Sequence, residues 1–390
     1  MVDLAGQHGH IQAELDAALL SAAKAGAYIQ GPEVKSFATE LADYLEVAHV
    51  IPCANGTDAL QIALMALGLK PGDEVITATF TYVATAEVMA LLGLTPVLVD
   101  VRPDTFSLDL DQVRAAIGPK TKAVVPVHLY GQAADMEALM QLAQDHSLFV
   151  VEDCAQAIGS TYTFSDGRKA KVGTIGHIGC TSFFPSKNLG CMGDGGAMYT
   201  QDAALAEQLR MIANHGQKVK YRHDVIGCNS RLDTLQAAVL RVKLPHLNAY
   251  IQARQEAAAY YDAGLSQIEG VIVPARTSAS THVFHQYTLQ VKNDQRDALK
   301  AHLEAAGIPS MIYYPWPLHA QPAFASDRYP VGAFPVAERL CHEVLSLPMH
   351  TELTPKFKTI LYTPSKSFTT YENHCCRNRL CRPCDRSLPL

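Results

Sequence analysis

Leu148-Phe149-Val150-Val151-Glu152-Asp153 is an apolar run that ends in two acidic residues. Its first four residues are apolar without alternation, which is typical of a strand covered on both faces of a parallel sheet. Ala123–Val127 has the same character, and amphipathic helical segments separate such runs from about residue 45 to 200. This alternation predicts an α/β fold with a mostly parallel central sheet flanked by helices. Ligands of such sheets bind at the carboxyl ends of the strands.

The pattern changes after residue 200, where helical segments are longer and strands fewer. We expect a large domain over residues 1–245 and, joined by a long helix over Leu247–Leu265, a smaller α+β domain over 246–355. Residues 356–390 have few large aliphatic side chains and no helical period, so a poorly ordered tail is expected. The expected strands are Ala48–Pro52, Glu74–Ala78, Pro96–Asp100, Ala123–Val127, Leu148–Glu152, Cys180–Phe184, Val283–Val291 and Pro309–Tyr313.

The composition excludes several classes of protein. The chain has 390 residues, of which 48% are apolar and 18% charged, as in a globular protein with a large core. The net charge of −6 gives no basic surface for nucleic acid or an anionic membrane. No apolar run approaches the length of a membrane span, and the first residues do not resemble a signal peptide. We therefore expect a cytoplasmic protein.

The C-terminal end differs from the rest of the chain. Residues 355–390 carry seven Lys or Arg against two acidic residues, a charge of +5 that leaves −11 for the remainder. Four of the ten cysteines also lie there, including the pair Cys381 and Cys384. A lone C-x-x-C is a weak zinc signal, so we expect no metal, although a zinc-binding module stays an alternative. The other six cysteines are scattered singly, which indicates reduced core residues.

Three stretches could carry chemistry. Asn55-Gly56-Thr57 lies between a strand and a helix, where a free helix N-terminus can hold a phosphate. Asp153 ends an apolar strand, where it could hold a protonated ring nitrogen, and Gln156 follows one turn later. Lys187 lies between aromatic residues and a glycine-rich stretch, and a desolvated lysine can form a Schiff base. Each also has a structural alternative: a plain capped helix, a helix-capping aspartate, and a solvated surface lysine.

The order of the three stretches is more specific than any one of them. A phosphate cradle, then an acid at a strand end, then a buried lysine is what pyridoxal 5′-phosphate requires. Together with other motifs along the chain, these stretches resemble the sugar aminotransferase family of fold-type-I, pyridoxal-phosphate-dependent transferases. The resemblance covers about residues 3–355. Its motifs are Tyr28–Val34, Ala54–Leu60, Pro71–Ile76, Phe80–Thr85, Val127–Gln132, Glu152–Gln156, Ser182–Ala197, Asn214–Gly216, Asn229–Ala238, Tyr314-Pro315 and Ser346–His350.

The resemblance implies a role for each matching residue. Lys187 would form the Schiff base with the cofactor and shuttle protons, and Asp153 would pair with the pyridinium nitrogen. Gly56, Thr57 and Ser182 would hold the phosphate of the cofactor. Gln156 would contact the ring oxygen, and Tyr82 would stack on the ring face. Asn229 would reach the phosphate of the cofactor that is bound to the partner subunit. Arg231, His215 and Tyr314 would contact substrate. Tyr82 could instead be a core residue, and Asn229 and Arg231 could merely cap the helix that follows.

The resemblance also implies a reaction. Related dehydratases carry His where this chain has Lys187, so a transaminase is expected, acting as a homodimer with the active site at the subunit interface. The motifs are closest to the branch that aminates UDP-2-acetamido-2-deoxy-3-keto-glucuronic acid with L-glutamate for bacterial O-antigen. Relatives have His-Tyr-Pro where this chain has Tyr313-Tyr314-Pro315. The alternatives are a 3- or 4-aminotransferase for another dTDP-, GDP- or UDP-keto-deoxysugar, and a non-catalytic regulator that binds the cofactor.

Overall fold

A computed structural model describes residues 2–353 of the chain. Its centre is a seven-stranded sheet in the order β1-β9-β8-β5-β4-β2-β3. The five strands β8, β5, β4, β2 and β3 are parallel to one another, whereas β9 is antiparallel to both β8 and β1. The strands are β1 (His49–Cys53), β2 (Glu74–Ala78), β3 (Thr95–Val99), β4 (Thr121–Val125), β5 (Phe149–Asp153), β8 (Ile178–Ser182) and β9 (Gly196–Thr200).

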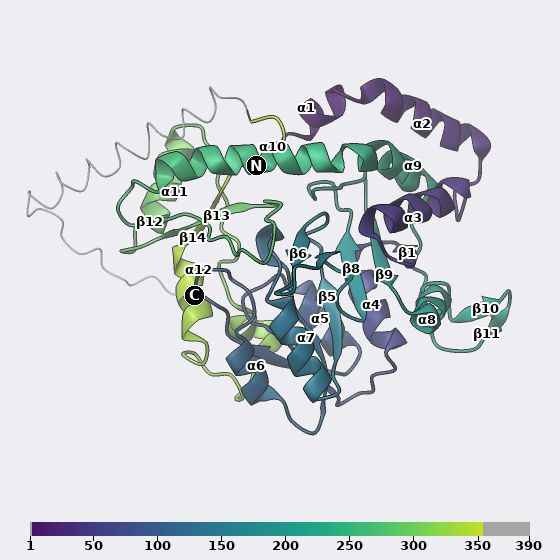
Figure 1. Ribbon diagram of the computed structural model, residues 1–390, viewed down its shortest axis with the longest axis horizontal. Helices are drawn as coiled ribbons and strands as arrows, with labels where there is room; N and C mark the ends of the chain where they lie inside the picture. The colour runs from purple at the N-terminus through teal and green to yellow at the C-terminus, as the bar shows by residue number, and fades with distance from the viewer. Residues whose placement is uncertain (1, 354–390) are drawn as a thin grey trace, which may run out of the picture.

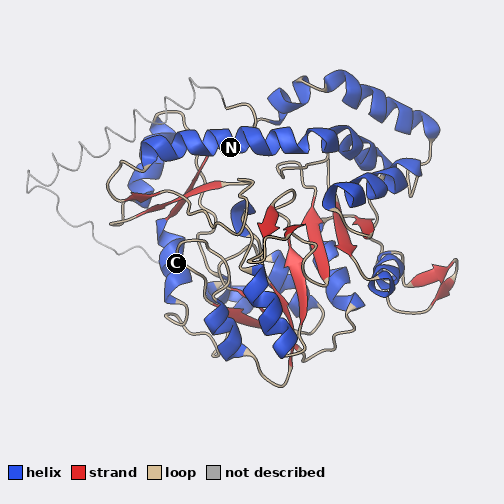
Figure 2. Cartoon of the chain, viewed as in Figure 1, coloured by secondary structure: helices blue, strands red, loops and turns tan. Residues whose placement is uncertain are grey.

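Helices cover both faces of this sheet (Figures 1 and 2), which confirms the predicted α/β fold. In β5, Val150 packs into the core on one face and Val151 into the core on the other. The helices on the Val151 face are α4 (Gly56–Ala66), α5 (Ala84–Leu91) and α8 (Ala203–Ala213). Those on the Val150 face are α3 (Pro32–Leu45), α6 (Leu110–Ala116), α7 (Met136–Asp145) and α9 (Thr234–Lys243).

The C-terminal part of the described chain forms a second, three-stranded antiparallel sheet in the order β12-β13-β14. The long helix α10 (Leu247–Leu265) runs across the top of Figure 1 from α9 to this sheet. The other elements here are β12 (Val271–Ile272), β13 (Tyr287–Val291), α11 (Arg296–Ala305), α12 (Pro335–Glu343) and β14 (Val344–Leu347). The boundary at residue 245 stays a prediction, and the tail over 356–390 lies outside the described residues.

The remaining elements are short or peripheral. Two helices, α1 (Leu4–Gly9) and α2 (Gln12–Ala25), precede α3, and α2 ends at Gly26, whose φ of 68° is left-handed. Two small hairpins are β6 (Thr161–Thr163) with β7 (Lys169–Lys171), and β10 (Gln217–Val219) with β11 (Arg222–His223). The second hairpin projects from the body at the right of Figure 1. No helix among the described residues is long and apolar enough to span a membrane.

Several predicted boundaries were wrong. The expected strand Val283–Val291 begins only at Tyr287, because residues 283–286 leave the sheet to contact Tyr130 and Gly131. The expected strand Pro309–Tyr313 is a single bridge between Met311 and Ser346. Strand β9 was not predicted. The six cysteines of the described chain are free thiols, and all but Cys228 are buried, as the scattered pattern predicted.

Candidate active site

A cavity of about 480 Å3 lies where the chain leaves β1, β5 and β8. These strands point the same way, since β8 is parallel to β5 and β1 and β8 are each antiparallel to β9. Their carboxyl ends therefore meet at one edge of the sheet, as expected for a ligand site. Eight of the sequence-predicted site residues line this cavity: Gly56, Thr57, Tyr82, Asp153, Gln156, Ser182, Lys187 and Tyr314.

One wall is the N-terminus of α4. Asn55 precedes the helix in extended conformation, and its side-chain oxygen accepts a hydrogen bond from Asp58 N at 2.8 Å. Gly56 is the first helical residue, and a Cβ placed there would lie 2.7 Å from the Cβ of Ser182. Only glycine allows the helix start to approach the end of β8 this closely. The first backbone N–H groups of a helix have no partner within it, so this corner can hold an anion.

Asp153 is the last residue of β5 and is 6% exposed. Its Oδ2 accepts a hydrogen bond from Thr85 Oγ1 at 2.8 Å, and Oδ1 accepts from Ala155 N at 3.1 Å. Its carbonyl accepts from His128 N at 3.0 Å. No helix starts here, because the residues after Cys154 form turns, so the helix-cap interpretation of Asp153 was wrong. The carboxylate is held rigidly in the cavity wall, where it can balance a positive charge.

Gln156, in the turn after β5, and Tyr314, three residues after the Met311 bridge, are joined by a hydrogen bond. Gln156 Nε2 donates to the Tyr314 hydroxyl at 3.1 Å, while Gln156 Oε1 accepts from Tyr130 N at 2.7 Å. The ring of Tyr314 also lies 6.2 Å from that of Tyr82, centroid to centroid. Tyr82 itself is 57% exposed, so it is not a core residue. Its ring stands at the mouth of the cavity, where a flat ligand could stack on it.

Lys187 follows a turn after β8, with its backbone N–H donating to Phe184 O at 2.8 Å. Burial lowers the pKa of its amine to about 8, and the charge of Asp153 partly opposes this shift. A solvated lysine has a pKa near 10.4, so a much larger fraction of Lys187 is neutral near pH 8. A neutral amine is the nucleophile that forms a Schiff base with an aldehyde. The surface-lysine interpretation is thus disfavoured by the geometry.

Some residues of the cavity were missed from sequence. His285, Gln286, Tyr313, Phe184 and Asp194 also line it. His285 and Gln286 come from the segment before β13, nearly a hundred residues after Lys187, and nothing in the local pattern places them at the cavity. Tyr313 is brought in because its carbonyl accepts a hydrogen bond from the hydroxyl of Tyr130. Its position next to Tyr314, in the motif predicted to contact substrate, could have indicated that Tyr313 lies at the cavity.

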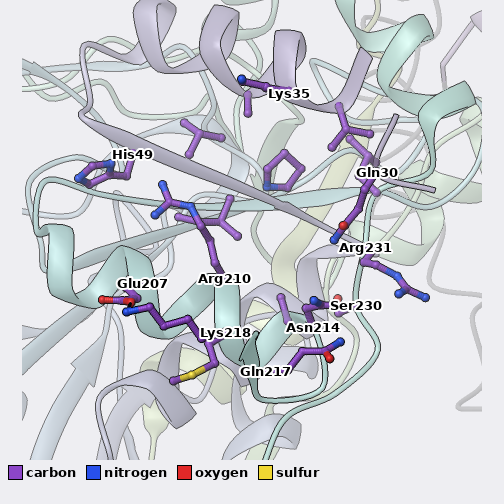
Figure 3. A pocket seen from close by; sticks show the side chains of 18 of the residues that line it. Gln30, Lys35, His49, Glu207, Arg210, Asn214, Gln217, Lys218, Ser230 and Arg231 are labelled. Carbon is purple, nitrogen blue, oxygen red and sulfur yellow. Dashed lines mark ion pairs between the residues drawn. The ribbon is translucent and has the colours of Figure 1, made fainter. Parts of the chain in front are cut away.

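Three predicted residues lie elsewhere. Asn229 and Arg231 line a separate pocket of about 490 Å3, which shares only Asp194 with the first cavity. Arg231 also lines a third pocket, of about 700 Å3, between α3, β1 and α8. Figure 3 shows that pocket, in which the side chains of Arg231 and Arg210 point to opposite sides. His215 lines none of these three pockets, and its carbonyl accepts from the ring of His223 at 2.7 Å.

The donor set of the first cavity fits pyridoxal 5′-phosphate. The glycine-lined helix start suits the phosphate, the buried Asp153 suits a protonated ring nitrogen, and the desolvated Lys187 suits the aldehyde. The cavity volume also accommodates a ring and phosphate of that size. The order along the chain is the one that the sequence predicted.

The sequence profile of the DegT/DnrJ/EryC1/StrS aminotransferase family matches residues 10–360. The chain is 48% identical to a pleiotropic regulatory protein of Geobacillus stearothermophilus, over 90% of this chain and 94% of that protein. It is 47% identical to a UDP-2-acetamido-2-deoxy-3-oxo-D-glucuronate aminotransferase of Pseudomonas aeruginosa, over 90% and 95%. It is 44% identical to a dTDP-3-amino-3,4,6-trideoxy-alpha-D-glucose transaminase of Streptomyces venezuelae, over 90% and 91%.

Solved structures agree with the sequence comparisons. An aminotransferase of this family from Brucella abortus superposes with a TM-score of 0.89 at 43% identity, covering 94% of this chain and 98% of that one. NtdA of Bacillus subtilis, solved with its bound cofactor PMP, superposes with a TM-score of 0.85 at 31% identity, covering 92% and 81%. The chain therefore belongs to the DegT/DnrJ/EryC1/StrS aminotransferase family, and is a nucleotide-sugar transaminase that uses pyridoxal 5′-phosphate.

Proposed function

We propose that this enzyme moves the amino group of L-glutamate to carbon 3 of UDP-2-acetamido-2-deoxy-3-keto-glucuronic acid, for bacterial O-antigen synthesis in the cytoplasm. The observation that supports it is the 47% identity to the Pseudomonas aeruginosa glucuronate aminotransferase, with Lys187 and Asp153 together in one cavity. A glucuronate substrate needs a cation for its carboxylate, and Arg231 is our candidate.

We infer the cofactor-binding roles from the family resemblance, and the residues concerned line one cavity. Gly56 and Thr57 at the start of α4, together with Ser182, hold the phosphate. Asp153 binds the ring nitrogen, Gln156 the ring oxygen, and Tyr82 stacks on the ring face. Pyridoxal 5′-phosphate, when bound, supplies an aldehyde that carries the amino group and a ring that withdraws electrons. Thr85 keeps Asp153 aimed at that ring through the 2.8 Å hydrogen bond to Oδ2.

Lys187 is the acid–base group of the reaction. Its amine, with a pKa of about 8, accepts a proton from the carbon that bears the donated nitrogen and returns one to the acceptor sugar. Lys187 lines the cavity together with Tyr82, Tyr313 and Tyr314, and burial lowers the pKa of its amine. Both half-reactions use this one cavity, so we expect ping-pong kinetics.

The active site is completed by a second copy of the chain. Asn229 is exposed and lies in the adjoining pocket, so in a homodimer it can reach the phosphate of the partner's cofactor. Tyr221, between β10 and β11 in the projecting hairpin, is 83% exposed, and Ile226, three residues after β11, is 85% exposed. Exposed apolar side chains of this kind are typical of a subunit interface. His215 lies beside the same hairpin, and we place it near the partner's substrate together with Arg231.

An amination assay tests the substrate. The enzyme, L-glutamate and a panel of UDP-, dTDP- and GDP-linked keto-sugars are incubated, and amino-sugar product is measured by mass spectrometry. Product from the UDP-3-keto-glucuronate in preference to the other sugars supports the proposal. Product only from a 4-keto-deoxysugar contradicts it. Arg231→Ala serves as the internal control, because it should raise KM for the glucuronate but not for a UDP-3-keto-sugar that lacks the carboxylate.

Two other functions have specific support. The 44% identity to the Streptomyces venezuelae transaminase favours a dTDP-linked keto-deoxysugar, and Tyr313 at a sugar-contacting position would suit a substrate that lacks a carboxylate. The 48% identity to a protein named as a pleiotropic regulator favours a regulatory role. Turnover with any keto-sugar in the panel would exclude a purely non-catalytic regulator, since Lys187 and Asp153 would then be in use.

A further inference from the structure

Tyr130 lies in the Val127–Gln132 motif, and none of the roles proposed above involves it. It is the middle residue of η1 (Leu129–Gly131), a short turn between β4 and α7. The side chain is 2% exposed and does not line the cavity around Lys187. Its φ of 59° and ψ of −3° are left-handed, a conformation that is costly for a bulky side chain. Such strain persists only where surrounding contacts impose it, and it is often found near functional sites.

Three segments of the chain bind the three polar groups of Tyr130. Its N–H donates to Gln156 Oε1 at 2.7 Å. Its carbonyl accepts from Gln286 N at 3.3 Å. Its hydroxyl donates to the carbonyl of Tyr313. Gln156, Gln286 and Tyr313 all line the cavity, so a residue outside the cavity is bonded to its wall at three places.

The backbone N–H of Tyr130 fixes which way the Gln156 amide faces. A backbone N–H can only donate, so the amide atom that it contacts must be the oxygen. The Nε2 group then faces the other side, where it donates to the Tyr314 hydroxyl at 3.1 Å. Nε2 carries two protons, and it makes no second hydrogen bond within residues 2–353. One N–H of Gln156 is therefore available for the ring oxygen of the cofactor.

The same orientation leaves the proton of Tyr314 free. The Tyr314 hydroxyl accepts from Nε2 of Gln156, and an amide nitrogen cannot accept a proton in return. The hydroxyl makes no other hydrogen bond in the part of the chain that the structure describes, so it can donate to a bound substrate. Two free protons at the cavity wall, one on Gln156 and one on Tyr314, thus depend on one backbone N–H.

The hydroxyl of Tyr130 holds the backbone beside Tyr314. Tyr313 directly precedes Tyr314, and its carbonyl belongs to the peptide group that joins the two residues. A hydrogen bond to that carbonyl therefore restrains the position of Tyr314. The ring of Tyr130 packs edge-to-face on Phe106, with 5.2 Å between the centroids, which restrains the hydroxyl in turn.

We propose that Tyr130 is a positioning residue of this transaminase, which holds Gln156 and Tyr314 so that each presents one proton to the cavity. The N–H of Tyr130 serves the cofactor contact, and its hydroxyl serves the substrate contact. The inference rests on the proposed contact of Gln156 with the ring oxygen and on the expected contact of Tyr314 with substrate. It gives the Val127–Gln132 motif a function, although Tyr130 itself touches neither ligand.

The first test removes the hydroxyl and keeps the N–H. Tyr130→Phe loses the hydrogen bond to Tyr313, whereas the backbone bond to Gln156 remains. Enzyme loaded with pyridoxamine 5′-phosphate is mixed with the keto-sugar that gives most product in the panel, and absorbance follows a single turnover. We expect the rate constant to fall about tenfold, because the proton of Tyr314 is less well placed. The dissociation constant of pyridoxal 5′-phosphate, from titration of the cofactor-free enzyme, should stay within about twofold.

Tyr261→Phe is the matched control. Tyr261 is also buried, and its hydroxyl also donates to a backbone carbonyl, that of Pro348, at 2.9 Å. It does not line the cavity. Losing this hydroxyl should lower thermal stability by a similar amount but leave the single-turnover rate unchanged. An unchanged rate in Tyr130→Phe, or an equal loss in Tyr261→Phe, would overturn the proposal.

A double-mutant cycle shows whether the hydroxyl of Tyr130 acts through Tyr314. Tyr314→Phe alone should lower the single-turnover rate by at least about tenfold. In that background, Tyr130→Phe should cost less than about twofold, because no proton is left to be positioned. Independent, multiplicative losses would contradict the proposal. The variants are compared on whichever sugar reacts, so this inference can fail while the proposed substrate stands, and the reverse.

Gln156→Glu tests the N–H side without any sugar. A carboxylate still accepts from Tyr130 N–H, but it has no proton for the ring oxygen and captures the proton of Tyr314. We expect the dissociation constant of pyridoxal 5′-phosphate to rise about tenfold in absorbance titrations. In this background, Tyr314→Phe should have little further effect on the single-turnover rate. Unchanged cofactor binding would show that the orientation of the amide is not the feature that matters, and the proposal would fail.

Discussion

The cavity around Lys187 and the pocket that contains Asn229 and Arg231 differ in how completely one chain builds them. In the first, Asp153 and Gln156 are buried and each is held by hydrogen bonds within the chain. In the second, Asn229 is exposed and Arg231 only half-buried. Groups that act within one chain can be fixed by its own packing, whereas groups offered to a partner must remain at the surface until assembly.

This difference between the two regions indicates which roles one chain can perform with its own residues alone. Cofactor chemistry requires a fixed carboxylate and a dry amine, and one chain supplies both. Substrate recognition at an interface requires residues whose final surroundings come from the partner. The two regions should therefore respond differently to mutation: changes in the first should abolish chemistry in each chain, and changes in the second should be correctable by mixing chains.

The largest effect is expected from Lys187→Ala. Loss of the acid–base amine should lower kcat by at least about a thousandfold. Lys243→Met is the matched control, because Lys243 is also buried with a pKa lowered to about 8, yet it does not line the cavity. We expect its kcat to stay within about twofold of the wild type. Steady-state amination kinetics measure both, and equal losses in the two variants would contradict the assignment.

Asp153→Asn should have the next largest effect, lowering kcat about a hundredfold, because a neutral amide cannot balance a positive ring nitrogen. The variant keeps the size of the side chain and can still accept the hydrogen bond from Thr85. Thr85→Val, which removes that hydrogen bond but leaves the charge, should cost much less. If the two variants lose the same activity, the charge of Asp153 is not the feature that matters.

The pH dependence tests the same pair of residues. Only the neutral amine of Lys187 captures the cofactor, and its pKa is about 8. The rate of cofactor binding to the cofactor-free enzyme should therefore be constant above this pH and fall tenfold for each unit below about pH 7. Stopped-flow absorbance measures it. Because the charge of Asp153 raises the pKa of Lys187, the midpoint in Asp153→Asn should move to lower pH.

The sequence predicted the first region much better than the second. Strand β5 was recognisable because Val150 and Val151 face opposite cores, and such a strand must be apolar on both sides. The helix start was predicted because Asn55 and Gly56 stand where a strand meets a helix, and it lies at the cavity. These signals are local, and the packing of the sheet turns each of them into a position at its carboxyl edge.

The parts that sequence reasoning missed depend on contacts between distant segments. His285 reaches the cavity because residues 283–286 bond to Tyr130 and Gly131 instead of joining β13 at once. The expected strand over Pro309–Tyr313 does not form for a similar reason, because the carbonyl of Tyr313 accepts a hydrogen bond from the hydroxyl of Tyr130. Propensity cannot report such tertiary contacts, which override it. In the proposed homodimer, the roles of His215 and Asn229 would depend further on a second chain.

Subunit mixing gives the smallest but most discriminating effect. Asn229→Ala alone should raise the cofactor concentration at half-saturation about tenfold, because one hydrogen bond to a charged phosphate is lost. When Lys187→Ala and Asn229→Ala chains are unfolded together and reassembled, half of the dimers contain one chain of each. In such a dimer, one site carries both substitutions and the other carries neither if Asn229 acts on the partner's cofactor. At low cofactor concentration, activity should then rise to about a quarter of the wild-type value, whereas no rise is expected if Asn229 serves its own chain.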